Sequence, residues 1–257
     1  MTTNPYSAPA APVADPEQAL LGNFVPGGRG VASGRGASWF GEAWQLFKTA
    51  PVLWIAIWIV MVLILIALNF IPLLGGLANA LLWPVFSAGL MLGCQAIASG
   101  GKLEFGHLFA GFRDRLGTLA GIGGLTLLAS VAIGAIVVSA MGLGLSTLLG
   151  TTRPATPEAA VTTLLAGLIM LALMLPLFMA MWFAPALVVF NERGALEAMV
   201  ESFRGCLKNV GPFLVYGLVG LLLTIAATIP LGLGWLVLGP MSAASIYAGY
   251  RDIYFRP

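Results

Sequence analysis

Charged side chains are scarce in this chain of 257 residues, and four long stretches hold none at all. Only 9% of the residues are Asp, Glu, Lys or Arg, against roughly 25% in an ordinary soluble domain. The uncharged stretches cover 53 residues after Lys48, 37 after Arg115, 33 after Glu158 and 42 after Lys208. Because so few charges cannot cover a water-facing surface, this composition excludes a soluble globular protein.

Cysteine and histidine are nearly absent as well, which argues against several kinds of chemistry. The two cysteines, Cys94 and Cys206, do not suggest a disulfide framework. His107 is the single histidine, so neither a zinc site nor a convincing Ser–His–Asp set can be assembled. We therefore expect no catalysis, no metal and no cofactor. An enzyme would have to use acidic side chains near the cytoplasmic surface, namely Glu104, Asp114, Glu197 and Glu201.

A cleavable signal peptide is not expected at the start of the chain. Residues 1–36 contain five prolines and six glycines, with no apolar run of signal-peptide length. Such a segment buries too little side chain to offset its ordering entropy. We expect residues 1–36 to be a disordered cytoplasmic tail, either simply solvated or serving as a partner-binding arm, and residues 37–257 to form the membrane domain.

The uncharged stretches predict an all-α integral membrane protein with six crossings. A bilayer core about 30 Å thick needs roughly 20 apolar residues per helix. The two middle stretches therefore suit one crossing each, and the two outer stretches suit helical hairpins. The expected helices cover residues 51–71, 77–98, 118–149, 161–190, 212–229 and 233–250.

The basic residues predict the orientation of these helices. Lys and Arg in short loops favour the cytoplasmic side of a membrane. With six helices, eleven of the twelve basic residues lie on the side of the two termini, and only Arg153 lies on the other. Changing the helix count by one destroys this segregation. We therefore expect both termini to be cytoplasmic.

An amphipathic pattern recurs before the first, third and fifth expected crossings. Apolar residues stand at i, i+3, i+4 and i+7, followed by a base at i+8, which is typical of short helices in the headgroup plane. The apolar positions are Phe40, Ala43, Trp44 and Phe47, then Phe105, Leu108, Phe109 and Phe112, then Leu196, Met199, Val200 and Phe203. The bases are Lys48, Arg113 and Arg204.

The even-numbered crossings share a second feature. Pro84, Pro185 and Pro240 are each followed by small residues, and small residues let membrane helices pack closely. Together the two patterns predict three repeats of an interfacial elbow helix plus two crossings. The alternative is that any loop beside a membrane helix looks somewhat amphipathic. Repeats surround a central site in some transporters, but they also arise as packing modules.

The expected crossings contain no ionisable residue in their interiors, which argues against ion-coupled transport. The basic residues instead form a collar at the cytoplasmic side. The collar comprises Lys48, Arg113, Arg115, Arg204, Lys208 and Arg251. It either serves only to orient the protein during insertion, or it holds anionic lipid headgroups or a cytoplasmic partner.

Two motifs resemble those of a family of uncharacterised bacterial multi-pass inner-membrane proteins. The opening motif is Gly34–Trp39 followed by Trp44–Phe47, and the closing motif is Gly239–Ser245 followed by Tyr247 and Gly249–Ile253. The resemblance implies a bacterial inner (cytoplasmic) membrane and carries no established activity. A more distant likeness is to the membrane part fused to some glycerophosphodiester phosphodiesterases, whose catalytic domain nothing here resembles.

The sequence thus favours a non-catalytic membrane protein that acts as a scaffold or as a module binding anionic membrane lipids or an unknown protein partner. The alternative is a permease or channel for a neutral or lipophilic solute, passing between the proline-bent helices. A membrane enzyme is the third hypothesis. The net charge of +2 gives no reason to expect a nucleic-acid partner.

Overall fold

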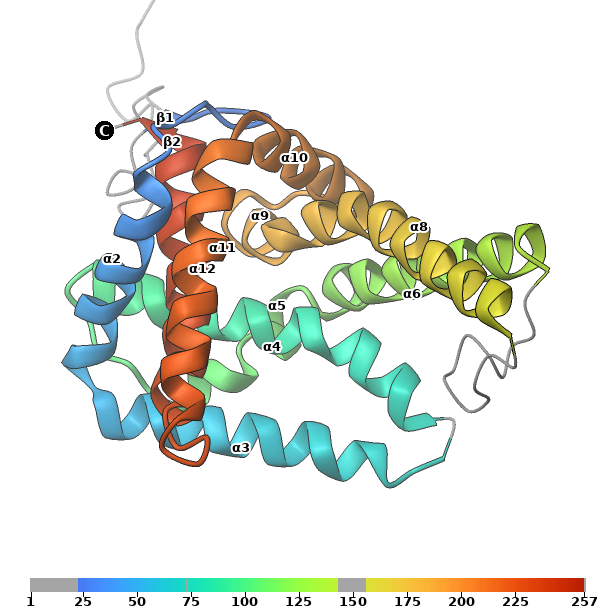
Figure 1. Cartoon of the computed structure of the whole chain (residues 1–257). Coiled ribbons are helices and arrows are strands. Elements are labelled where there is room, and N and C mark those ends of the chain that lie inside the picture. Colours follow the sequence, from blue (N-terminus) through green and yellow to red (C-terminus); the bar gives the residue numbers. More distant parts are fainter. Residues whose placement is uncertain (1–22, 73, 143–155, 257) are drawn as a thin grey trace, which may run out of the picture.

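The structure is a computed structural model that describes residues 23–72, 74–142 and 156–256 (Figure 1). The regular structure in these ranges is helical apart from two short strands. Five helices are long and apolar enough to cross a membrane, so the expected all-α membrane fold is confirmed. They are α3 (Pro51–Asn69), α4 (Leu74–Ala98), α6 (Leu116–Ala140), α8 (Pro157–Trp182) continued by α9 (Ala184–Asn191), and α11 (Val210–Thr228).

The sixth expected helix is present as α12 (Trp235–Tyr254), but it is not among these five. Its glycines, hydroxyl groups and the charged pair Arg251 and Asp252 make it more polar than the others. Much of α12 is buried against neighbouring helices. Figure 1 shows α11 and α12 running alongside one another, with α3 across one end of this pair.

Two of the expected helices differ from the structure by more than a few residues at one end or by a break. The third helix, expected to reach residue 149, ends at Ala140, and residues 143–149 lie outside the described ranges, as does Arg153. The fourth continues through Pro176 but breaks at Phe183. Pro185 then stands in the first turn of α9, where a missing backbone N–H costs no helical hydrogen bond.

All three segments with the repeated apolar pattern are helical. They form α2 (Arg35–Thr49), the 3₁₀ helix η1 (Phe105–Phe109) with α5 (Gly111–Asp114), and α10 (Ala195–Lys208). The second segment is thus shorter and broken, whereas the first and third are continuous helices. Glu104 precedes η1 and His107 lies in its first turn, and the side chain of each contacts the backbone of the other. His107 therefore has a local structural role.

The apolar stripe of α2 packs mainly inside the protein, which differs from the expected position in the headgroup plane. Phe40, Ala43 and Phe47 are buried, and only Trp44 of this stripe is substantially exposed. Phe40 stacks on Tyr216 of α11, with ring centroids 4.6 Å apart. An amphipathic pattern does not distinguish a lipid surface from a protein surface, since both accept apolar side chains.

The centre of the molecule is built from the proline-containing segments of α4, α9 and α12. Pro84, Pro185 and Pro240 are all buried. The small residues after them, including Ala88, Ala186 and Ala244, belong to one continuous hydrophobic core. At Gly239 a Cβ would collide with the ring of Trp58, so α12 and α3 pack closely only because this position has no side chain.

The two ends of the described chain are joined. Strand β1 (Asn23–Phe24) pairs antiparallel with β2 (Phe255–Arg256). Val25 N–H donates to the Tyr254 carbonyl at 2.7 Å, and Arg29 N–H donates to the Ile253 carbonyl at 2.9 Å. Residues 1–22 of the tail lie outside the described ranges. From Asn23 onward the structure differs from the expected disorder, because these backbone groups find partners at the far end of the chain.

Candidate functional site

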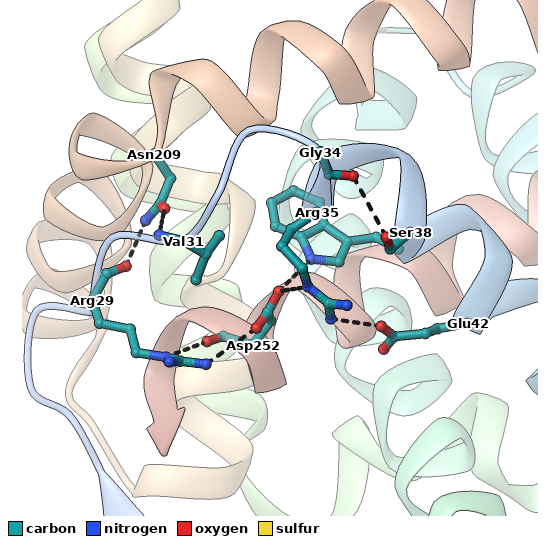
Figure 2. Close-up of polar contacts among 9 residues, drawn as sticks. Arg29, Val31, Gly34, Arg35, Ser38, Glu42, Asn209 and Asp252 are labelled. Atoms are coloured by element: carbon teal, nitrogen blue, oxygen red, sulfur yellow. Dashed lines mark hydrogen bonds and ion pairs between the residues drawn. The ribbon is translucent and has the colours of Figure 1, made fainter. Parts of the chain in front are cut away.

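A concentration of partly buried polar contacts between side chains lies where the two ends meet, and we call it the terminal cluster (Figure 2). It consists of Arg29, Arg35, Trp39, Glu42 and Asp252. Asp252, from the last turn of α12, accepts hydrogen bonds from Arg29 Nη2 at 3.2 Å, Arg35 Nε at 2.5 Å and Trp39 Nε1 at 3.0 Å. Arg35 Nη2 also donates to Glu42 Oε1 at 2.6 Å. One carboxylate therefore joins the N-terminal segment, α2 and α12.

Burial makes these contacts important for stability. The Asp252 side chain is only 10% exposed, whereas those of Arg29 and Arg35 are 34% and 38% exposed. A carboxylate so far from water must be paired and hydrogen-bonded. The hydrogen bond to Asp252 raises the pKa of Arg35, and the Glu42 carboxylate adds to this effect. Arg35 therefore remains charged.

A second set of contacts fixes the backbone beside the terminal cluster. The amide of buried Asn209 accepts a hydrogen bond from Val31 N–H and donates to the Arg29 carbonyl, both at 2.8 Å (Figure 2). Lys208 Nζ donates to the Gly28 carbonyl at 2.8 Å. Gly28 has φ of 70°, and a Cβ there would lie 2.8 Å from Ile253, so a larger residue would be strained.

The terminal cluster opens into a cavity of about 200 Å³. Arg251, which precedes Asp252, contributes a third guanidinium group and lies 5.9 Å from the centroid of the Tyr247 ring. Three guanidinium groups therefore face two carboxylates, leaving one positive charge in excess. The lining residues are Arg29, Arg35, Glu42, Ala248, Arg251, Asp252 and Phe255.

A smaller polar group lies beside α10. Arg193 Nη1 lies 2.7 Å from Glu197, and Arg193 Nη2 lies 3.4 Å from Glu201. Glu201 is 8% exposed, and burial raises the pKa of its carboxyl group. Phe24 covers Arg193, with the guanidinium carbon 5.5 Å from the ring centroid. Four acidic residues were considered for an enzyme. Glu197 and Glu201 lie near one another because both contact Arg193, whereas Glu104 stands at the start of η1. The Asp114 side chain lies outside the described part of the structure.

The structure does not gather the six collar residues at one place. Lys208 is bonded to Gly28, Arg115 pairs with Glu192 at 2.7 Å, and Arg251 lines the cavity. The other three are exposed and form no ion pair among the residues that the structure describes. These are Lys48, Arg113 and Arg204. Each lies in or beside the last turn of one of the three helical segments that precede a hairpin.

Sequence reasoning missed Arg29, Arg35 and Asp252 as members of a site. A signal was present, because the opening motif contains Arg35 and the closing motif contains Asp252. Asp252 is also the sole acidic residue after Glu201. A lone carboxylate in an aromatic segment at the end of the last helix could have suggested that Asp252 is paired. Its partners Arg29 and Arg35 could not be identified, because they lie more than 200 residues away along the chain.

Metal binding finds no support in the described ranges, where no group of three or more His, Cys, Asp or Glu side chains is close enough to hold an ion. The terminal cluster is suited to an anion instead. Guanidinium groups are planar donors that match the oxygens of phosphate and carboxylate groups. The arrangement can therefore bind an oxyanion without any covalent chemistry.

The chain is similar to a probable inner membrane protein of Burkholderia thailandensis. The two are 28% identical over 231 residues, which cover 85% of this chain and 82% of the relative. No family model matches the chain, and no solved structure matches it either. The link to glycerophosphodiester phosphodiesterases receives no support from these comparisons. Similarity to an inner membrane protein, together with five helices able to cross a membrane, identifies a multi-pass helical membrane protein.

Proposed function

We propose that this protein is a non-catalytic scaffold of the bacterial inner membrane that binds anionic lipid headgroups, and an unidentified protein partner, at its cytoplasmic side. One observation carries the proposal. Lys48, Arg113 and Arg204 are exposed, lack an acidic partner in the described ranges, and occupy comparable places in three successive units. Bases that are not used inside the protein are available to lipid phosphates, which attract them by about 1 kcal/mol each.

Six crossings with both termini in the cytoplasm belong to this proposal. Because β1 pairs with β2, the start and the end of the described chain lie on the same side of any membrane that the protein crosses. An odd number of crossings would separate them. Five helices have the length and hydropathy to cross, so an even number is reached when α12 is the sixth.

The threefold repeat is supported by the core. Each unit consists of a helical segment, an apolar helix and a proline-containing partner, and the three prolines Pro84, Pro185 and Pro240 are all buried. Equivalent buried positions are the expected result of three units packed around one centre. The shorter second segment, η1 with α5, is the main departure from this regularity.

Lipid binding is tested by native mass spectrometry of the purified protein with phosphatidylglycerol. The double variant Arg113→Gln/Arg204→Gln should lower the affinity at least tenfold, since two juxtamembrane charges are lost. Lys102→Gln/Arg256→Gln is the matched control, because it removes two exposed bases outside the collar. Equal losses in the two double variants would contradict the proposal and indicate a general effect of net charge.

A permease is the second candidate, and a crevice between α3, α4 and α12 favours it. This crevice has a volume of about 90 Å³ and lies beside the buried prolines of α4 and α12. It is lined by Trp58, Met61, Trp83, Ser87, Leu90, Gly239, Ser242, Ala243 and Ile246. Proteoliposomes should then transport a neutral solute such as glycerol, and Ser87→Leu should block the flux. Flux equal to that of protein-free liposomes would count against a permease.

A further inference from the structure

The cavity of the terminal cluster presents hydrogen-bond donors that the protein does not itself use. Arg29 uses Nε and Nη2 to bind the carbonyl and carboxylate of Asp252. Arg35 uses Nε for Asp252 and Nη2 for Glu42. A guanidinium group has five N–H donors, and the Nη1 groups of both arginines have no partner among the described residues. Both side chains line the cavity.

Arg251 adds a third guanidinium group that carries no carboxylate of its own. It is exposed, lines the same cavity and forms no ion pair within the described ranges. Its one aromatic contact is with Tyr247, at 5.9 Å from the ring centroid. The excess positive charge of the cavity can therefore be assigned to Arg251.

The arginines that bind Asp252 are held in place before any ligand arrives. Asp252 is fixed by three donors, one of them the indole N–H of Trp39, which is 1% exposed. The Asn209 side chain fixes the backbone of Arg29 by donating a hydrogen bond to its carbonyl. Side chains ordered in this way lose little conformational entropy when they bind a ligand. The site is thus preorganised, unlike the mobile bases of an ordinary protein surface.

We infer that this cavity is a discrete site for a phosphate group, bound by Arg29, Arg35 and Arg251. Its volume of about 200 Å³ is far larger than the roughly 10–15 Å³ that a cavity needs to hold one water. A tetrahedral phosphate presents oxygens in several directions, so it can meet three guanidinium groups from separate segments. A planar carboxylate offers only two oxygens. The carboxylate of Asp252 does not repel the ligand strongly because both of its oxygens are already bonded to donors.

The phosphate can belong to a lipid headgroup or to a soluble compound, and the experiment has one arm for each. In the first, the full-length protein in detergent is titrated with inorganic phosphate at constant ionic strength, and binding is followed by calorimetry. In the second, phosphatidylglycerol is added and bound lipid is counted by native mass spectrometry. Only the lipid arm rests on the proposed function. The Arg113→Gln/Arg204→Gln variant leaves this cavity intact. Loss of lipid binding in that variant therefore tests the proposed function, whereas binding of inorganic phosphate tests this inference alone.

Arg251→Gln is the main test variant, since it removes a donor without breaking an ion pair. We expect it to lower the affinity for phosphate, phosphatidylglycerol or both by about tenfold or more, as loss of a charge-assisted hydrogen bond would. Arg256→Gln is the matched control, because it removes an exposed base from the neighbouring strand β2 but not from the cavity. Its affinity should stay within about twofold of that of the unchanged protein.

Glu42→Gln provides a result that a purely structural cluster would not give. It removes negative charge from the cavity while Asp252 still holds Arg35, so the affinity should rise a few fold. The phosphate site is supported if Glu42→Gln raises the affinity and Arg251→Gln lowers it for the same ligand. The ligand that shows both changes, inorganic phosphate or phosphatidylglycerol, identifies the source of the phosphate. Absence of saturable binding in both arms, or equal losses in Arg251→Gln and Arg256→Gln, would overturn it.

Discussion

At the scale of single residues, the Asp252 side chain joins three segments of the chain: α12, α2 and the N-terminal segment before α2. Its carboxylate joins Arg29, Arg35 and Trp39, which come from the N-terminal segment and from α2. In a chain with only ten acidic residues, this one is nearly buried and has its oxygens fully engaged. The same contacts orient the arginines of the proposed phosphate site, so structure and binding depend on one side chain.

Asp252→Asn should lower the free energy of unfolding by about 2–3 kcal/mol, because two charge-assisted hydrogen bonds are weakened or lost. Partly buried Arg29 then keeps its charge without a carboxylate partner, and Arg35 keeps only its pair with Glu42. Thermal unfolding of the purified protein in detergent measures the change. Glu42→Gln is the control, since the exposed Arg35–Glu42 pair should contribute less than about 1 kcal/mol. Equal effects of the two substitutions would show that Asp252 is not the central contact.

Glu201 should make stability depend on pH. Burial raises its folded-state pKa above the usual 4.5, so the folded protein holds the proton more tightly than the unfolded chain does. The resulting stabilisation is complete below about pH 4.5 and is lost as the pH rises through the folded-state pKa.

Thermal unfolding midpoints of the unchanged protein and of Glu201→Gln should therefore diverge as the pH rises above about 4.5, with the variant losing less stability. Glu197→Gln is the control, because Glu197 is half exposed and contacts the same Arg193. Parallel pH profiles for the unchanged protein and Glu201→Gln would show that Glu201 titrates as it does in the unfolded chain.

At the scale of the elements, glycines determine how closely the helices pack. A Cβ at Gly89 of α4 would collide with the carbonyl of His107 and lie 2.8 Å from that of Leu108. A Cβ at Gly111 would collide with the carbonyl of Val85, also in α4. The segment containing η1 and α5 therefore packs backbone to backbone on α4. This close contact explains how such a short segment holds its position before the second hairpin.

Gly89→Ala should destabilise the protein by about 1–3 kcal/mol, because the new methyl group meets rigid backbone rather than a side chain that can move. Gly76→Ala is the matched control in the same helix, since no atom lies within 4 Å of its Cβ position. That control should be neutral or slightly stabilising, as Ala favours helix more than Gly does. Equal unfolding midpoints for the two variants would contradict the close contact.

At the scale of the whole molecule, the pairing of β1 with β2 relates the two ends of the described chain to the membrane. The hairpin turn between α11 and α12 lies at the other end of those helices, near Leu233. With six crossings, Gly34 and Leu233 lie on opposite sides of the membrane. The background for a labelling test is low, because Cys94 and Cys206 are buried and burial raises the pKa of Cys206 to about 12.

Gly34→Cys and Leu233→Cys should consequently react from opposite sides with a membrane-impermeant maleimide. Both positions are exposed, and a side chain at Gly34 meets no atom within 4 Å. In intact cells with a permeable outer membrane, Leu233→Cys should be labelled and Gly34→Cys should be labelled only after lysis. Labelling of both variants in intact cells would contradict the orientation and the six crossings together.

The sequence by itself determined the membrane class and the approximate position of every described helix. It could do so because transfer of a side chain from water to lipid depends mainly on that side chain, so hydropathy and charge act position by position. The expected range 212–229, for example, became α11 at Val210–Thr228. The helical character of the three segments before the hairpins also followed from a local pattern.

Only the tertiary structure decided what those local patterns contact. The apolar stripe of α2 packs on α11 rather than on lipid, and the segment from Asn23 is ordered by the C-terminal strand. Arg29 and Asp252 are 223 positions apart, so their pairing depends on the path of the whole chain. An ion pair forms only where two side chains lie close together in space, and the local sequence around each residue does not contain that information. The candidate site therefore emerged from the fold, although both of its motifs were visible in the sequence.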